Sequence, residues 1–339
     1  MNTMWWKALF ATMLAPALMG VSVHAYSQAS DFYKDKVLNI IVAGGPAGGH
    51  TRYARLIGPY LQKHTGAREV RITNMPGGGG LKAANHMWRL KPDGMNIFFG
   101  NVATLILAPL AGSTGAQFEP GKFTFLGRAT SEPRFLTVGG KSSIKTFADV
   151  KKLGRPFVYP SQGTDEDFYT MAVLAHALGF KMKAVTGYEG NADTALAVIK
   201  GDGDGHITGW SESQGAIKAG DKRPILVIAS QRHADYPDVP TAEETAPADQ
   251  RSLIRAIVNI NETHRSYIAP PGTDPQATAA FRAALKAVMN DPAFLEETTK
   301  GNRPVSYMEG AQQQQIVAEI TKAGAGLTPI LKGAVQEIQ

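Results

Sequence analysis

The chain has 339 residues, no cysteine, and 35 Lys and Arg against 29 Asp and Glu, which gives a formal net charge of +6. The lack of cysteine excludes disulfides, thiolate metal sites and iron–sulfur clusters, and a hydrophobic content of 43% excludes a disordered chain. No run of five like charges occurs, which excludes a basic arm for nucleic acid.

The first 25 residues have the pattern of a secretory signal peptide. A single charge, Lys7, precedes an apolar run over residues 8–21, and Val23 and Ala25 offer small side chains to a signal peptidase. The run is shorter than the roughly twenty residues that a membrane helix needs. We therefore expect cleavage after Ala25 and export to a periplasm. Because no Cys can carry a lipid, we expect the mature chain to diffuse freely there.

Short apolar runs then alternate with helical patterns. A buried strand is expected at 37–43, and residues 51–63 place Tyr53, Leu56 and Ile57 on one face of a helix. Further strands are expected at 70–73, 95–100, 156–159, 182–185, 206–208 and 225–229, and further helices at 81–90, 165–178, 191–200 and 281–289. Strands that alternate with helices predict parallel sheets with crossover helices.

The length and this order of elements predict an α/β protein with two lobes. Each lobe is expected to be a mostly parallel sheet flanked by helices, with a ligand cleft between the lobes. The chain is expected to cross over near 128–138 and to return near 247–269. Lobe 1 would then comprise residues 32–130 and 248–339, and lobe 2 residues 131–247.

Glycine-rich loops follow four of the expected strands, at 44–51, 74–80, 160–164 and 186–190. In open α/β sheets, ligands bind beyond the carboxyl ends of the strands. Each loop leads into a helix, whose first turn has unpaired N–H groups and a partial positive charge. A single loop of this kind is often only structural. Four of them in corresponding positions predict an anion held between the lobes.

Six motifs occur in order along almost the whole mature chain. They are GGHTRYAR at 48–55, NMPGGGG at 74–80, PDG at 92–94, GYEG at 187–190 followed by AVIKGD at 197–202, Arg232 with YPDVPT at 236–241 and Glu243, and APPGT at 269–273 with Asp291-Pro292. Together they resemble the substrate-binding receptors of tripartite tricarboxylate transporters, the Bug-type periplasmic proteins.

The resemblance implies a type II-like periplasmic binding protein without enzymatic activity or cofactor. Such a receptor closes on a small dicarboxylate, tricarboxylate or aromatic carboxylate and delivers it, as a monomer, to integral-membrane permease subunits. It binds no metal and no nucleic acid. Carried over residue by residue, the family's carboxylate site falls on Gly49, His50, Thr51, Gly79, Ser161, Gly163 and Thr164.

Two positions depart from the family's pattern. The usual Asp of the first loop falls on Thr51, and the bulky residue that often precedes this loop falls on Gly44. Losing the acid removes a partner for a ligand ammonium and a repulsion toward a ligand anion. We therefore expect an amino-acid ligand to be disfavoured, and a larger or more anionic acid to be tolerated.

Several single residues allow two interpretations. His50 is either a donor to the ligand or an exposed loop residue, and Trp210 either stacks on an aromatic ligand or packs between the lobes. Tyr188 is expected to form a pocket wall. Arg52 and Arg134 could each pair with a ligand charge, but surface positions are the expectation for both.

Three other functions remain to be weighed. A flavin or nicotinamide enzyme is disfavoured, because Ala43 stands where the first glycine of the nucleotide-binding turn belongs, and no acid ends the second strand. A hydrolase is disfavoured by the lack of a Gly-x-Ser-x-Gly elbow, and the DGDG sequence at 202–205 lacks the remaining ligands of a calcium loop. A sensor that presents its ligand to a signalling partner stays open.

Overall fold

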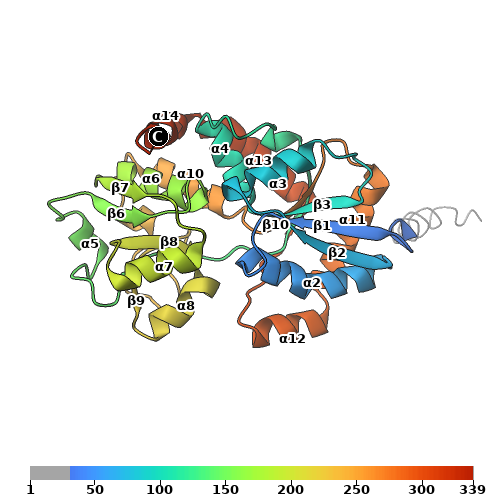
Figure 1. Ribbon diagram of the computed structural model, residues 1–339, viewed down its shortest axis with the longest axis horizontal. Helices are drawn as coiled ribbons and strands as arrows, with labels where there is room; N and C mark the ends of the chain where they lie inside the picture. Colours follow the sequence, from blue (N-terminus) through green and yellow to red (C-terminus); the bar gives the residue numbers. More distant parts are fainter. Residues whose placement is uncertain (1–30, 339) are drawn as a thin grey trace, which may run out of the picture.

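The computed structural model describes residues 31–338, which form two lobes lying side by side (Figure 1). The expected signal peptide, residues 1–25, lies outside the described residues. We call the part built on the larger sheet the first lobe and the part that contains β5 to β9 the second lobe. The division expected from the sequence, at residues 130 and 248, stays a prediction.

The first lobe is built on a six-stranded sheet in the order β11–β4–β10–β3–β1–β2. The strands are β1 (Val37–Val42), β2 (Glu69–Asn74), β3 (Asn96–Gly100), β4 (Thr124–Arg128), β10 (Ser266–Ala269) and β11 (Met308–Glu309). β1 pairs in parallel with both β2 and β3, as the alternation of strands and helices predicted. The first two glycine-rich loops therefore leave the sheet at the same edge.

Helices cover both faces of this sheet. On one face, α2 (Gly49–Thr65) and α11 (Pro275–Met289) pack on β1 and β3 through side chains such as Ile57 and Phe281. The other face carries α3 (Leu81–Trp88), α4 (Val102–Leu110), α13 (Gly310–Ala323) and α14 (Thr328–Gln336), and α12 (Pro292–Lys300) lies next to α11. The apolar run at 102–110 is the buried helix α4, which starts where the Asn101 side chain accepts a hydrogen bond from the Ala103 N–H.

The second lobe contains two smaller sheets. β5 (Arg134–Gly139) lies between β8 (Gly205–Gly209) and β9 (Lys222–Ile228), and β6 (Phe157–Pro160) pairs with β7 (Met182–Val185). Its helices are α5 (Phe147–Val150), α6 (Glu166–Leu178), α7 (Asn191–Lys200), α8 (Trp210–Lys218) and α9 (Ala242–Thr245), and α10 (Arg251–Asn261) leads back to the first lobe.

The two-lobed α/β fold is confirmed, but the sheets are mixed rather than mostly parallel. β5 runs antiparallel to both β8 and β9, and β10 runs antiparallel to both β3 and β4. β5 and β10 are the strands that the chain forms on crossing from the other lobe, and the short strand β11 also runs antiparallel to β4. A strand that enters in this way follows no crossover helix of that sheet, so the parallel βαβ rule does not fix its direction.

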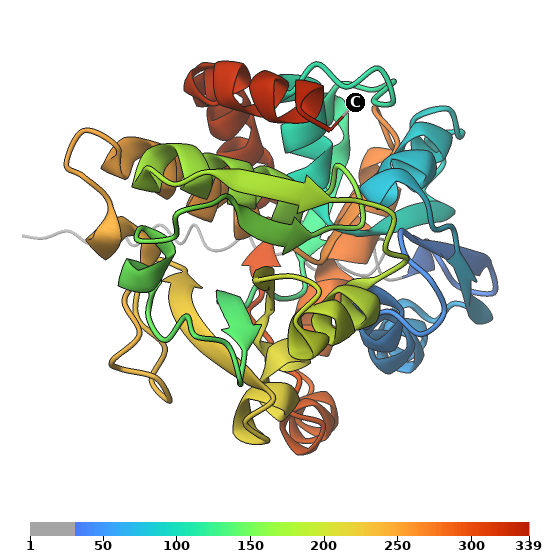
Figure 2. The ribbon, with the colours of Figure 1, turned by 60° about the vertical axis from the view of Figure 1, so that its left-hand side comes forward.

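α6 and α10 pack against the cores of both lobes. Ile257 and Ile260 of α10 belong to the core that contains α4 and α14, whereas Ile254 and Val258 belong to the core beneath β5 and β9. The C-terminal helix α14 packs on α6, and Figure 2 shows the red C-terminal helices above the green helix of the second lobe. The cores of the two lobes are therefore joined by shared helices.

Candidate functional site

The glycine-rich loops end in helix N-termini that lack side-chain caps. The N-cap residues of α2, α3 and α7 are Gly48, Gly80 and Gly190, which have no side chain that could accept a backbone hydrogen bond. α6 differs, because Oδ1 of Asp165 accepts a hydrogen bond of 2.9 Å from the Phe168 N–H. Three of the four loops thus present helix N–H groups that a bound anion could use.

The second and third loops meet across the lobes at Gly79. A methyl group placed on Gly79 would lie 3.2 Å from Cβ of Asp165, the residue that precedes α6. Gly79 also has a φ of 62°, in the left-handed region that favours glycine. The position therefore requires glycine both for its backbone conformation and for the close approach of the lobes.

The side chain of Thr51 forms hydrogen bonds that hold the first loop. Its buried hydroxyl donates to the carbonyl of Gly45 over 2.7 Å and accepts from Nδ2 of Asn74 over 2.6 Å. The same Nδ2 donates to the carbonyl of Gly44 over 2.8 Å. The two side chains therefore fix the first loop against the end of β2, so the hydroxyl of Thr51 already has its partners.

His50 lies in the first turn of α2 and is partly buried. Its ring packs edge-on against His264, with 5.1 Å between centroids, and Nε2 has no hydrogen-bond partner within residues 31–338. Burial, and then the charge of Arg265, lowers the pKa of His50 to about 3. The imidazole is therefore neutral at physiological pH, and its Nε2 is buried without a hydrogen-bond partner among the described residues.

Three charged side chains meet at the start of α2. Nη1 of Arg265 lies 2.5 Å from Oε1 of Glu132, and Nη2 lies 3.6 Å from Oε1 of Glu212. Arg265 also covers the ring of Tyr53, with Cζ 4.6 Å from its centroid. Only 1% of Arg265 is exposed, and its φ of 49° is uncommon for a residue other than glycine. The guanidinium is thus held between a residue of the crossover connection and one of α8.

A second buried cluster surrounds Arg134, which corrects the expectation of a surface position. Nη1 of Arg134 lies 2.7 Å from Oε1 of Glu166, and Nη2 pairs with Asp167. His264 lies 3.5 Å from the same Glu166 oxygen, and the other oxygen of Glu166 has no partner in the described part of the chain. Burial raises the pKa of Glu166 to about 7, although Arg134 acts in the opposite direction.

The third loop forms a small hydrogen-bonded turn. Oγ of Ser161 donates to the carbonyl of Gly163 over 2.8 Å and accepts from the Gly163 N–H over 3.1 Å. Thr164 follows directly, partly buried before Asp165, and the Tyr188 N–H lies 3.4 Å from the carbonyl of Ser161. The third and fourth loops are therefore neighbours on the cleft side of the second lobe.

The ring of Trp210 packs within the second lobe, on Phe135, His233 and Tyr236. Its backbone N–H donates to the carbonyl of Pro133, in the crossover connection, over 3.0 Å. The role expected for Trp210 at the ligand site stays a prediction.

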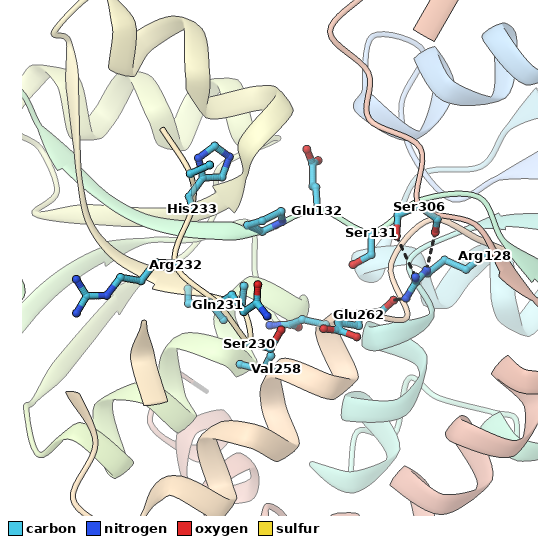
Figure 3. A pocket seen from close by; sticks show the side chains of 15 residues that line it. Arg128, Ser131, Glu132, Ser230, Gln231, Arg232, His233, Val258, Glu262 and Ser306 are labelled. Carbon is cyan, nitrogen blue, oxygen red and sulfur yellow. Dashed lines mark hydrogen bonds between the residues drawn. The ribbon is translucent and has the colours of Figure 1, made fainter. Parts of the chain in front are cut away.

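A cavity of about 380 Å³ lies beside the same connection. It is lined by the end of β4 and the β4–β5 connection on one side, and by the loop after β9 and the end of α10 on the other. Figure 3 shows Arg128 at one end of it, bonded to Ser306 and Glu262, and His233 at the other. None of the nine residues expected at the ligand site lines this cavity. It adjoins the charged cluster only through Glu132.

Sequence reasoning missed Glu132, Glu166, Glu212, His264 and Arg265 as members of the site. These residues stand singly in the sequence, outside the glycine-rich loops, so no motif groups them. One available signal was the pair His264-Arg265 immediately before a buried strand, where polar residues are uncommon unless they find partners. Arg52, in contrast, is exposed on α2, as expected.

Two further searches of the described residues bear on other functions. Between residues 31 and 338, no helix is long and apolar enough to cross a membrane, and no group of three His, Asp or Glu side chains is placed to hold a metal ion. The DGDG sequence at 202–205 forms a turn, in which Asp204 pairs with Arg155 and accepts a hydrogen bond of 2.7 Å from the Val158 N–H.

Comparisons with known proteins bear on the family and on the fold. A family model described as the tripartite tricarboxylate transporter family receptor matches residues 54–329. The UPF0065 protein in the gbd 5′ region of Cupriavidus necator is 25% identical over 318 residues, which cover 91% of each chain.

Two solved structures from Rhodopseudomonas palustris share the fold. MatC with bound malate is 20% identical, covers 86% of this chain and 99% of its own, and has a TM-score of 0.70. A second protein, with adipate, is 18% identical, covers 87% of this chain and 97% of its own, and has a TM-score of 0.71.

Proposed function

Since the chain belongs to the tripartite tricarboxylate transporter receptor family, whose members are periplasmic solute receptors rather than enzymes, we propose that it binds a small organic carboxylate between its lobes and delivers it to a membrane permease. Export through a signal peptide at residues 1–25 is part of this proposal. So is the assignment of Gly49, His50, Thr51, Gly79, Ser161, Gly163, Thr164, Tyr188 and Trp210 as the residues around the ligand.

The observation that carries the proposal is the meeting of loops from both lobes beside helix N-termini that have no side-chain cap. Gly79 of the first lobe lies against Asp165 of the second, and α2 and α7 start nearby without side-chain caps. An anion held there would be bound by main-chain N–H groups of both lobes. The malate and adipate found in structures of the same fold support a small carboxylate as the anion.

The mechanism follows from the two-lobed architecture. Open and closed forms exchange by hinge motion, and a ligand that contacts both lobes stabilises the closed form. A hydrogen bond to a charged group contributes about 1.5–3 kcal/mol, so three to five of them are sufficient for micromolar affinity after the cost of ordering. No bond in the ligand is broken or formed.

A thermal-shift screen of dicarboxylates, tricarboxylates and aromatic acids tests the proposal, because a ligand that binds the folded state raises the melting temperature. The best ligand is then titrated against Gly79→Ala and, as a matched control, Gly78→Ala. Both glycines have positive φ, 62° and 56°, so both variants carry similar backbone strain. Only the methyl group on Gly79 would meet the second lobe.

We expect Gly79→Ala to weaken binding by on the order of tenfold, since closure would require the lobes to move apart at Asp165. Gly78→Ala should bind as the unchanged protein does. Equal affinities for the two variants, or no stabilisation by any carboxylate, would contradict the proposal.

A further inference from the structure

The side chain of Glu212 fills the place where a ligand carboxylate is expected. Its Oε1 lies directly against Gly49, the first residue of α2, and 3.6 Å from Nη2 of Arg265. Its Oε2 accepts hydrogen bonds from Nδ2 of Asn191 over 2.7 Å and from Oγ1 of Thr208 over 3.1 Å. The carboxylate of Glu212 thus lies beside the first residue of a helix and contacts a guanidinium and two neutral donors, groups by which proteins bind carboxylates.

Arg265 shows that this place is built for an anion. The guanidinium is 1% exposed and is directed at Gly49, and its Nε has no hydrogen-bond partner among the described residues. Burial alone would raise the pKa of Glu212, but Arg265 and the hydrogen bond from Asn191 hold it below its ordinary value. Glu212 is therefore charged, and it satisfies a site that would otherwise leave a buried cation partly unpaired.

The buried arginines near this place already have acidic partners. Arg265 pairs with Glu132 and Glu212, and Arg134 pairs with Glu166 and Asp167. Two buried arginines thus face four carboxyl groups, although burial raises the pKa of both Glu166 and Asp167. A further buried cation, Lys222, lies 3.0 Å from Nε2 of His206. Arg303, which lies 5.8 Å from the Tyr53 ring, is partly exposed, so water and salt screen its charge.

Glu212 is less buried than Glu132. The side chain of Glu132 is completely buried and is bonded to Arg265 and to both the hydroxyl and the N–H of Ser211. The side chain of Glu212 is 20% exposed and sits on α8 in the second lobe, opposite α2 in the first. Opening of the cleft separates it from Gly49 and frees the start of α2.

Resting on the proposed function, we propose that a ligand carboxylate takes the place of the Glu212 side chain and that the cleft selects ligands carrying one carboxylate and no second anionic group. The exchange leaves the local charge unchanged, so it needs no new cation. A second carboxylate on the ligand would enter a cluster in which each arginine already has two acidic partners. A neutral or cationic far end would avoid this repulsion.

This inference revises the expectation that Thr51 in place of an acid permits a more anionic ligand. That expectation considered only the first loop. The carboxyl groups that face the cleft come from α6, α8 and the crossover connection, through Glu166, Glu212 and Glu132.

The test uses carboxylates with the same number of carbon atoms. The end opposite the shared carboxylate is a methyl group, an ammonium group or a second carboxylate. One set is butyrate, 4-aminobutyrate and succinate, and the other is hexanoate, 6-aminohexanoate and adipate. Affinities are measured by calorimetry on the mature chain. In at least one set we expect the dicarboxylate to bind more weakly than both the unsubstituted acid and the amino acid. Its affinity should be on the order of tenfold lower than that of the amino acid.

Glu212→Gln removes one negative charge and keeps the shape of the side chain. We expect this variant to reduce the difference in affinity between monocarboxylate and dicarboxylate by several-fold. Asp238→Asn, in the exposed loop after β9 of the same lobe, makes the same change in net charge and should leave this difference in affinity as it is.

The outcomes separate this inference from the proposed function. If the dicarboxylate binds most tightly in both sets, the inference is wrong, whatever the result for Glu212→Gln, while a loss of affinity in Gly79→Ala would still support carboxylate binding in the cleft. If no probe and no other acid binds, the proposed function itself fails. The affinities in the unchanged protein decide the matter even if a variant folds poorly.

Discussion

Gly49 at the start of α2 lies directly against the carboxylate of Glu212 on α8, so the two lobes touch where a side chain would not fit. A methyl group on Gly49 would collide with Oε1 of Glu212 and would lie 3.1 Å from Nη2 of Arg265. The absence of a side chain at this position is what allows the cleft to close.

Gly49→Ala should therefore weaken ligand binding by on the order of tenfold without lowering stability, because alanine is a better helix residue than glycine and the open form can hold the methyl group. Calorimetric titration and urea unfolding measure the two effects. Gly45→Ala is the control, since a methyl group there would meet no atom within 4 Å. A loss of affinity in both variants would argue against a contact specific to Gly49.

Thr51→Val tests whether this hydroxyl holds the loop or binds the ligand. The variant loses the hydrogen bonds to Gly45 and Asn74, so we expect the free energy of unfolding to fall by about 1–3 kcal/mol. Thr51→Ser keeps the hydroxyl and should lose less. If Thr51→Val kept its stability and lost only affinity, the hydroxyl would have to face the ligand instead.

Arg134→Met should be strongly destabilising, because it leaves Glu166 and Asp167 buried without their cation. Breaking a buried ion pair costs about 3–5 kcal/mol. The control is Arg71→Met, which removes an exposed ion pair with Glu69 and should cost much less stability, because water screens that pair. Urea unfolding of both variants at neutral pH measures the difference, and similar losses would mean that the Arg134 cluster contributes little.

The pH dependence of stability should contain a contribution from His50. Its pKa is about 3 in the folded protein and about 6.5 in an unfolded chain, so below pH 6.5 the unfolded chain binds a proton that the folded protein does not. The contribution of His50 to stability is therefore lost as the pH falls from 6.5 toward 3.

Between pH 6.5 and pH 5, His50→Gln should lose less stability than the unchanged protein, by up to about 2 kcal/mol. His86→Gln, at an exposed position on α3, is the control and should follow the unchanged protein. Chemical unfolding at the two pH values gives the result, and parallel curves for His50→Gln and the unchanged protein would contradict the shift.

The sequence was sufficient for those parts of the fold that depend on local pattern. β7 and α7 have the expected ends, and α7 stops where Gly201 adopts a φ of 90°. The glycine-rich loops also follow the strands as expected. The directions of β5 and β10 could not be predicted, since they depend on how the chain crosses between lobes and not on the residues of the strands.

The charged part of the site was beyond sequence reasoning for a different reason. A single Arg or Glu in a helical or strand pattern is normally assigned to the solvent side, and this assignment was made for Arg134. Burial of Arg134 and Arg265 becomes predictable only when their acidic partners are known to be close. Those partners come from α6, α8 and the crossover connection, far apart in the sequence.

Side chains of α10 pack in two different cores. Ile254 and Val258 belong to one core, and Ile257 and Ile260 belong to the other. Because α10 is part of both cores, we expect that neither core unfolds while the other stays folded. Although the proposed mechanism requires the lobes to move relative to one another, they should unfold together, as a single cooperative unit with one calorimetric transition.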